Sequence, residues 1–349
     1  MSKLSIPSVC RSVVITLGVL SLWPADAKSA TPPRQRGSLS AEQVAALEKA
    51  LEAKPESIEE RARLLDHYMR TQYQSPESRR ARQRHILWVI EHNPTTDLAG
   101  PRIGLNKQID GDAYETGKQL WLNHVKAQPA NTAVLNRAAE YLLLSDRDMA
   151  EQLWQKAETL EPKNPRWPER LAHLYNLSTR TRTGIDTSAA GKALDAMERA
   201  HVLARGSDFN HFIELARLAF TAGELEKARE YADELLRRAP DHAGAWNYGN
   251  AIHDGNVVLG RIALREGKVD AAKERLRTAG KTPGSPQLNS FGPTMTLAAE
   301  LLERGEKETV LAYFNDCRVF WKSGGTRLDA WTSALTEGRP PDFGPNLRH

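Results

Sequence analysis

The stretch from Asn131 to Asn164 reads NTAVLNRAAEYLLLSDRDMAEQLWQKAETLEPKN, and its apolar residues recur at the spacing of two amphipathic helices joined by a short turn. Counted from Asn131, small residues stand at positions 8, 20 and 27, where two antiparallel helices have to approach closely: Ala138, Ala150 and Ala157. The bulky Tyr141 and Trp154 fill positions between them. Pro162 follows, and a proline there ends the second helix.

This 34-residue unit resembles a tetratricopeptide repeat, whose period and small-residue positions it shares. The preceding segment has the same register, because Gly117, Trp121 and Pro129 align with Ala150, Trp154 and Pro162 around a shared QLW core. The resemblance implies an all-α, right-handed α-solenoid of stacked helix-turn-helix repeats. Such units cannot bury their apolar faces alone, so they stack, and their concave groove binds protein or peptide segments.

The repeats extend over most of the chain. Prolines that close helices recur at intervals of 39, 35, 33 and 78 residues: Pro55, Pro94, Pro129, Pro162 and Pro240. We expect the solenoid to span residues 40–337, with 40–53 as the second helix of a truncated first repeat and 328–335 as a cap. The irregular parts are an exposed insertion near 179–191, an elongated helix over 244–266 and a proline-rich loop at 282–293. Residues 338–349 are expected to form a flexible tail.

The N-terminus has the features of a cleavable secretory signal. Lys3 and Arg11 precede an apolar run over 12–23, which is shorter than the ~20 residues that a membrane-spanning helix needs. Ala25-Asp26-Ala27 fits a cleavage site, so we expect a signal peptide over 1–27, a disordered linker over 28–39, and a secreted or periplasmic protein without a stable membrane anchor. The alternative is an uncleaved N-terminal anchor.

Composition excludes several classes of function. The full chain has a formal net charge of +4, and removing residues 1–27 takes away Lys3, Arg11 and Asp26, which leaves about +3. Nucleic-acid binding needs concentrated basic stripes, so no such partner is predicted. Cys317 would be the mature chain's single cysteine, and its repeat position indicates a buried structural thiol rather than a reactive one. The scattered histidines lack metal-ligand spacing, and we predict no metal, no cofactor and no catalytic residues.

A candidate binding site follows from the resemblance. In chaperone-adaptor members of the family, basic residues and asparagines on the first helices of three consecutive repeats clamp a carboxylate of a peptide. The matching positions here hold five polar residues: Arg102, Asn106, Asn136, Arg166 and Arg170. Guanidinium groups can bind a carboxylate through two parallel hydrogen bonds, and asparagine amides can bind a peptide backbone. The partner would be a protein or peptide with an anionic group or a C-terminal carboxylate; the alternative is an ordinary solvated surface.

A second candidate is the loop TPGSPQLNSFGP at 282–293, where turn-forming prolines and glycines surround four residues able to contact a ligand: Gln287, Asn289, Ser290 and Phe291. The loop can be a rigid link across the last two repeats or a lip beside the groove. The leading hypothesis is a non-enzymatic scaffold that binds a partner in the groove. The alternative hypothesis is an enzyme or carbohydrate-handling protein with a site between helix 244–266 and this loop.

Overall fold

The computed structural model describes residues 39–100, 104–181, 184–205 and 209–347, and in this part of the chain it is a stack of α-helices. The predicted signal peptide and linker lie outside the described residues, except for Leu39. The helices are α1 (Ala41–Ala53), α2 (Ile58–Thr71), α3 (Pro76–His92), α4 (Lys107–Ala127), α5 (Thr132–Leu142), α6 (Arg147–Leu160), α7 (Arg166–Asn176), α8 (Thr187–Leu203), α9 (Asn210–Ala222), α10 (Leu225–Arg238), α11 (Tyr248–Arg265), α12 (Val269–Gly280), α13 (Pro286–Phe291), α14 (Thr296–Leu302), α15 (Lys307–Phe320) and α16 (Gly325–Thr336). Short 3₁₀ turns and one strand pair complete them: η1 (Asp97–Ala99), η3 (Ala239–His242), η4 (Lys322–Gly324), η5 (Gly344–Leu347), β1 (Arg180–Thr181) and β2 (Gly184–Ile185).

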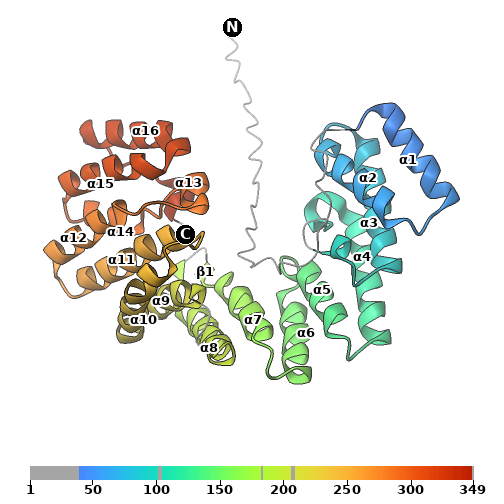
Figure 1. The fold of residues 1–349 in the computed structure, drawn as a ribbon, viewed down its shortest axis with the longest axis horizontal. Coiled ribbons are helices and arrows are strands. Elements are labelled where there is room, and N and C mark those ends of the chain that lie inside the picture. The colour runs from blue at the N-terminus through green and yellow to red at the C-terminus, as the bar shows by residue number, and fades with distance from the viewer. Residues whose placement is uncertain (1–38, 101–103, 182–183, 206–208, 348–349) are drawn as a thin grey trace, which may run out of the picture.

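Consecutive helices pack side by side along the chain, and the stack curves into an arch (Figure 1). Helices α5, α7, α9 and α11 lie on the inner, concave side, and α6, α8, α10 and α12 lie on the outer side. One apolar core runs from Leu65 in α2 to Ile262 in α11, and a second runs from Val257 to Phe343. Both cores draw on α11, so the layers form a continuous all-α solenoid of tetratricopeptide-like repeats, as the sequence pattern predicts.

The hairpin of α5 and α6 shows why the pattern fixes the fold. Ala138, Ala150 and Ala157 are fully buried between the helices, where a larger side chain would force them apart. The side chain of Asn131 caps α5 by accepting hydrogen bonds from two backbone N–H groups, and Asp146 caps α6 in the same way through one. These caps satisfy donors that a helix start leaves without partners.

The repeat before this hairpin departs from the pattern, because its clamp positions call for a first helix near 98–106, whereas the described residues 98–100 and 104–106 are not α-helical. The chain makes the short turn η1, and α4 begins only at Lys107. Asn106 ends up as the residue that caps α4, accepting hydrogen bonds from the N–H groups of Gln108 and Ile109. Pro101 has no N–H to donate and Gly104 favours non-helical backbone, so this stretch is a poor helix former.

In the first repeats a histidine is held in one protonation state by its neighbours. The guanidinium of Arg61 donates to Nδ1 of His85 over 2.9 Å, so this nitrogen must be the acceptor of a neutral ring. The other ring nitrogen lies 3.0 Å from Oε1 of Glu48. Burial lowers the pKa of His85 below its usual value, because a charged ring would be poorly solvated there.

The insertion after α7 forms a small antiparallel strand pair rather than only an exposed loop. Arg180 pairs with Ile185 and Thr181 with Gly184, and α8 then begins at Thr187. The sequence prediction missed the strands because two-residue segments are too short to show an alternating pattern. The pair projects on the concave side of the arch, near the end of the chain (Figure 1).

The two C-terminal segments that we expected to be irregular are both ordered. The loop 282–293 contains the helix α13, capped by Ser285 through the N–H of Leu288. The tail 338–349, expected to be flexible, packs onto the last repeats as far as Leu347. Phe343 is buried against Trp331, with ring centroids 5.1 Å apart, and Asn346 is fully buried. The prolines gave the tail the composition of a flexible segment, but this apolar contact holds it in place.

None of the helices in the described part of the chain combines the length and apolar character that crossing a bilayer would require.

Candidate functional site

The inner helices carry a row of polar side chains that face neighbouring repeats. Each of four inner helices contributes charged residues at helical spacing, and these residues are Arg137 and Glu140 on α5, Glu169, Arg170 and His173 on α7, Glu214 and Arg217 on α9, and Asp254 and Arg261 on α11. Most of them form ion pairs within a helix or with the next repeat. The inner helices therefore carry charges of both signs, most of which are paired within the chain.

Two of the predicted clamp residues meet, but they bind a carboxylate of the chain itself. The guanidinium of Arg170 donates to Oε1 of Glu140 over 2.5 Å, and the amide of Asn136 donates to the same oxygen over 3.0 Å. Arg137 donates to the other oxygen over 3.2 Å. The carbonyl oxygen of the Asn136 side chain accepts from the indole of Trp154 over 3.0 Å, so both ends of this amide are engaged.

This network is buried. The side chains of Arg170 and Glu140 keep only 10% and 5% of their exposure, and burial lowers the pKa of Arg170 to about 10. Asn136 is buried as well. Glu140 thus occupies the place that a ligand's carboxylate would take. The sequence prediction missed it because the family's clamp positions do not include the acid one helical turn from Asn136.

The other clamp candidates have different surroundings. Asn106 caps α4, and Arg102 lies outside the described residues. The guanidinium of Arg166 lies 5.3 Å from the ring of Trp167, at the start of α7. The structure therefore brings Asn136 and Arg170 onto one carboxylate oxygen, and the charge of Arg166 is close enough to help lower the pKa of Arg170.

A more accessible polar cluster lies where α7 faces α9. His173 is exposed, yet reduced solvation lowers its pKa, which is the combination expected of a group in a concave surface. Arg170 and Arg217 lower this pKa further, and Glu214 opposes them. Two residues further along α7, the hydroxyl of Tyr175 donates to Glu151 of the outer helix α6. Because two residues turn a helix by about 200°, His173 points away from α6 and toward the concave side.

Arg217 is the cation of this cluster that water reaches best. Its side chain keeps 39% of its exposure, compared with 10% for Arg170. Glu214, one turn earlier on α9, raises the pKa of Arg217, and Asp254 of α11 acts in the same direction. The cluster therefore connects charged groups of three inner helices.

The loop candidates around α13 serve mainly to dock that helix. The side-chain oxygen of Gln287 accepts from Asn250 of α11, and Oδ1 of Asn289 accepts from the N–H of Lys322 over 3.3 Å. The hydroxyl of Ser290 donates to the carbonyl of Pro286. Phe291 is partly exposed. Gln287 therefore fixes α13 to α11, and Asn289 fixes it to η4. These contacts are those expected of a rigid link between the last repeats.

The alternative site between α11 and residues 282–293 is filled by direct packing. Gly249 touches the backbone at Gly284 so closely that a Cβ atom would overlap its carbonyl oxygen. The hydroxyl of Thr282 donates to the carbonyl of Gly249 over 2.7 Å, and that of Ser285 donates to Asn250. This interface has no room for a substrate at these contacts.

A histidine, a carboxylate and a hydroxyl do lie in line nearby, but they cannot meet a substrate. Nδ1 of His253 lies 2.7 Å from Asp254, and Nε2 lies 3.0 Å from the hydroxyl of Tyr313. His253 and Tyr313 are both fully buried. Burial also raises the pKa of the adjacent Cys317 thiol, so the reactive thiolate is disfavoured. We interpret this array as polar groups that satisfy one another inside the last repeats.

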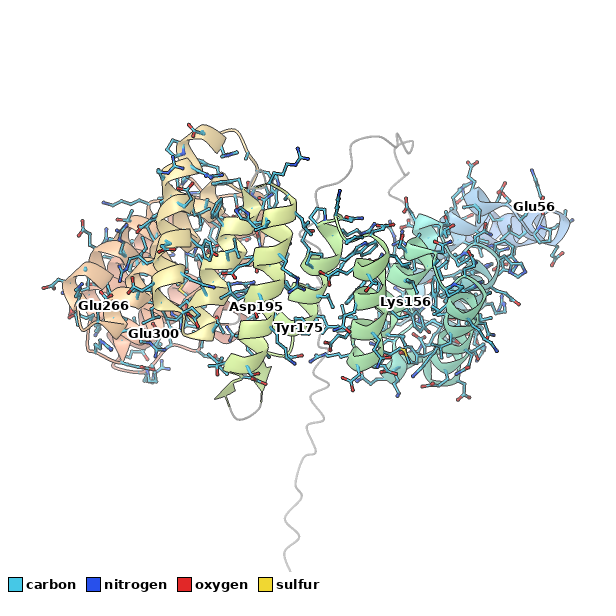
Figure 2. All side chains as sticks on the ribbon, turned by 90° about the horizontal axis from the view of Figure 1, so that it is seen from below. Glu56, Lys156, Tyr175, Asp195, Glu266 and Glu300 are labelled. Carbon is cyan, nitrogen blue, oxygen red and sulfur yellow. The ribbon has the colours of Figure 1, made fainter. Side chains whose placement is uncertain are left out.

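A shallow cleft of about 290 Å³ lies at the ends of α11 and α14, lined by Leu264, Arg265, Glu300, Glu303 and Arg304. Glu300, labelled in Figure 2, is held by Arg261 through hydrogen bonds of 2.7 to 3.1 Å. The lining combines two acids with two arginines and one leucine. In the described part of the chain, no group of three or more histidine, cysteine or acidic side chains could hold a metal ion.

Comparison with known proteins gives only distant similarity. No family model and no curated protein matches the chain. A solved structure described as the crystal structure of MamA protein shares 17% identity, with a TM-score of 0.39, over 53% of this chain and 89% of that one. A second, described as the crystal structure of MamA, shares 18% identity, with a TM-score of 0.37, over 50% and 90%. The assignment of the fold therefore rests on the helices and their packing.

Proposed function

We propose that this chain is a non-enzymatic scaffold that binds a segment of a partner protein along its concave face. The observation that carries the proposal is the cluster of His173, Glu214 and Arg217 on the adjacent inner helices α7 and α9. Its side chains are accessible to solvent, yet neighbouring charged groups shift the pKa values of His173 and Arg217. Polar groups that can change partners suit a surface that binds an extended peptide chain, whose backbone and side chains present both donors and acceptors.

The cluster also suggests the chemistry of the partner. Arg170 and Asn136 are already engaged by Glu140, so a carboxylate of the partner would bind at the more exposed Arg217 and displace Glu214. Charge-assisted hydrogen bonds from a guanidinium are strong and directional. We therefore propose a partner segment that carries an acidic side chain or a free C-terminus.

Site-specific photo-cross-linking tests which face binds. A photoreactive amino acid replaces His173 on the inner helix α7 in one variant, and Lys156 or Asp195 in two controls. Both control residues are exposed on outer helices and are labelled in the view of the convex side in Figure 2. We expect a discrete cross-linked protein in the native host from position 173 alone.

Adding Arg217→Ala to the position 173 probe should reduce this product several-fold, because the cation that binds the partner is removed. Arg147→Ala is the matched control, since this arginine contacts only the neighbouring turn at Leu177 and Ser178. Equal products from inner and outer positions would reject the concave face as the binding surface. A loss of the product with both arginine variants would instead point to a general loss of structure.

We further propose that the protein acts outside the cytoplasm after removal of residues 1–27. The support is the sequence alone: a basic start, a short apolar run and Ala25-Asp26-Ala27. Mass spectrometry of the protein recovered from its native host should find an N-terminus at Lys28. Recovery of protein that retains residues 1–27 would reject cleavage.

A further inference from the structure

The strand β1 and the C-terminal tail make a contact that a repeat stack does not require. In a solenoid each repeat touches only its neighbours, and the helix packing from α7 to α12 follows this rule. A hydrogen bond of 3.0 Å departs from this rule: it runs from Arg180 of β1 to the carbonyl of Leu347, 167 residues further along the chain. Figure 1 shows β1 and the chain end next to each other on the concave side.

We propose that β1 and the tail form a releasable clasp that fixes the curvature of the C-terminal half of the arch. The clasp is defined as Arg180 together with residues 343–347. It joins the α7–α8 repeat directly to the last repeats, so α9 to α12 are enclosed in a closed loop of contacts. This restraint does not depend on what the concave face binds.

The tail end of the clasp is rigidly attached to the last repeats. The side-chain amide of Asn346 donates to the carbonyls of Phe291 and Pro293 over 3.1 and 2.9 Å, and its backbone carbonyl accepts from the N–H of Met295 over 2.8 Å. The indole of Trp331 donates to the carbonyl of Asp342 over 2.7 Å. A force on Leu347 is therefore transmitted to α14 and α16 rather than absorbed by a loose end.

The β1 end is attached just as firmly to the middle of the arch. Thr179 is buried, and its hydroxyl donates to the carbonyl of Asn176 at the end of α7 over 2.8 Å. The N–H of Asp186, on the other side of the strand pair, donates to the carbonyl of Thr179 over 2.7 Å. Asp186 also caps α8. Arg180 is thus held between two helices whose position relative to the last repeats the clasp then determines.

The clasp itself is weak enough to open. It depends on an exposed arginine, whereas both anchors are buried. Loss of one hydrogen bond of this kind changes an equilibrium by about two- to tenfold. Helix packing between neighbouring repeats sets the average curvature of the C-terminal half of the arch. The clasp reduces the variation of this curvature about its average. Opening should therefore widen the spread of curvatures without unfolding any repeat.

The test measures a distance across the clasp with spin labels. Cysteines replace Asp195 on α8 and Val319 on α15, both of which are exposed. Cys317 stays in place, because it is buried and burial raises the pKa of its thiol, so it should not be labelled. We expect a narrow distance distribution in the parent chain and a broader one in Arg180→Ala, in which the fraction of molecules with an open clasp is about two- to tenfold larger.

Two variants distinguish the clasp from a general change. Arg147→Ala removes a similar arginine–carbonyl contact between neighbouring repeats and should leave the distribution narrow. Arg180→Lys keeps a donor and should restore part of the narrow population. Parent-like distances in Arg180→Ala would overturn the inference, whatever the outcome of the cross-linking test of the concave face.

Discussion

Replacing Glu140 by alanine should be among the most destabilising single changes in the described repeats, although the residue lies on the polar side of α5. The substitution removes the acceptor that Asn136, Arg137 and Arg170 share and leaves the guanidinium of Arg170 nearly buried without its carboxylate. Breaking a buried ion pair from one side typically costs about 3–5 kcal/mol, most of which is the penalty for the charge left behind. The same range is expected here, because both side chains are at most 10% exposed.

A double-mutant cycle separates the free energy of the Glu140–Arg170 ion pair from that of the packing lost with the Glu140 side chain. If the penalty comes from a buried guanidinium that has lost its ion pair with Glu140, Glu140→Ala combined with Arg170→Met should be less destabilising than Glu140→Ala alone. Glu140→Gln tests charge separately, since it keeps an acceptor for Asn136 and Arg170 but removes the anion. We expect Glu140→Gln to fall between the wild type and Glu140→Ala.

Urea unfolding followed by circular dichroism gives the free energies, with the slope of the transition as a check that the same surface unfolds in each variant. A loss of less than about 1 kcal/mol in Glu140→Ala would refute the reasoning, because that is the range for an exposed ion pair. Arg170 would then be available to a ligand, and the original clamp hypothesis would regain its support.

Three further predictions concern stability. Ala150→Phe should destabilise by about 1–3 kcal/mol or more in thermal unfolding, because Ala150 is fully buried between α5 and α6. Gly249→Ala would gain roughly 1 kcal/mol of helix propensity, yet its Cβ overlaps the carbonyl of Gly284, so urea unfolding should show a net loss. The lowered pKa of His85 means that the unfolded chain binds more protons below about pH 6.5, so stability is greatest above that pH and falls as the pH is lowered toward the folded pKa. His85→Gln should flatten this dependence in urea titrations between pH 5 and 8.

The repeat architecture could be predicted because its signal is local and redundant. Ala138, Ala150 and Ala157 are all fully buried where the 34-residue period places them, and proline positions mark the helix ends independently. Side chains in a repeat stack interact mainly with the same and the next repeat, so a pattern in one stretch of sequence already contains most of the packing. The length of α11 could be predicted in the same way, because the turn that follows it at Gly267 comes later in the sequence than the repeat period requires.

The tail and α13 could not be predicted in this way, because their order depends on contacts with distant segments. Composition gives residues 338–349 the features of a flexible end, with prolines and few apolar residues. Their fixed position depends on the fit of Phe343 against Trp331 and on Asn346, which bonds to carbonyls more than 50 residues away. Contacts between such distant segments leave no periodic pattern in the sequence. The segments that escape a repeat pattern are those that hold the last repeats together.

The candidate site shows a different reason for failure. Repeat positions correctly placed Asn136 and Arg170 on adjacent inner helices and within reach of one carboxylate oxygen. The repeat positions do not show whether these groups bind a carboxylate of a ligand or one of the chain itself. Glu140 lies four residues after Asn136 on the same helix, within direct reach of its side chain. Because Glu140 satisfies these groups in the folded chain, a ligand there would have to replace a buried ion pair. At Arg217 it would replace only a half-exposed one. Accessibility of the cation, rather than its repeat position, is therefore the property on which the proposal of Arg217 as the binding residue rests.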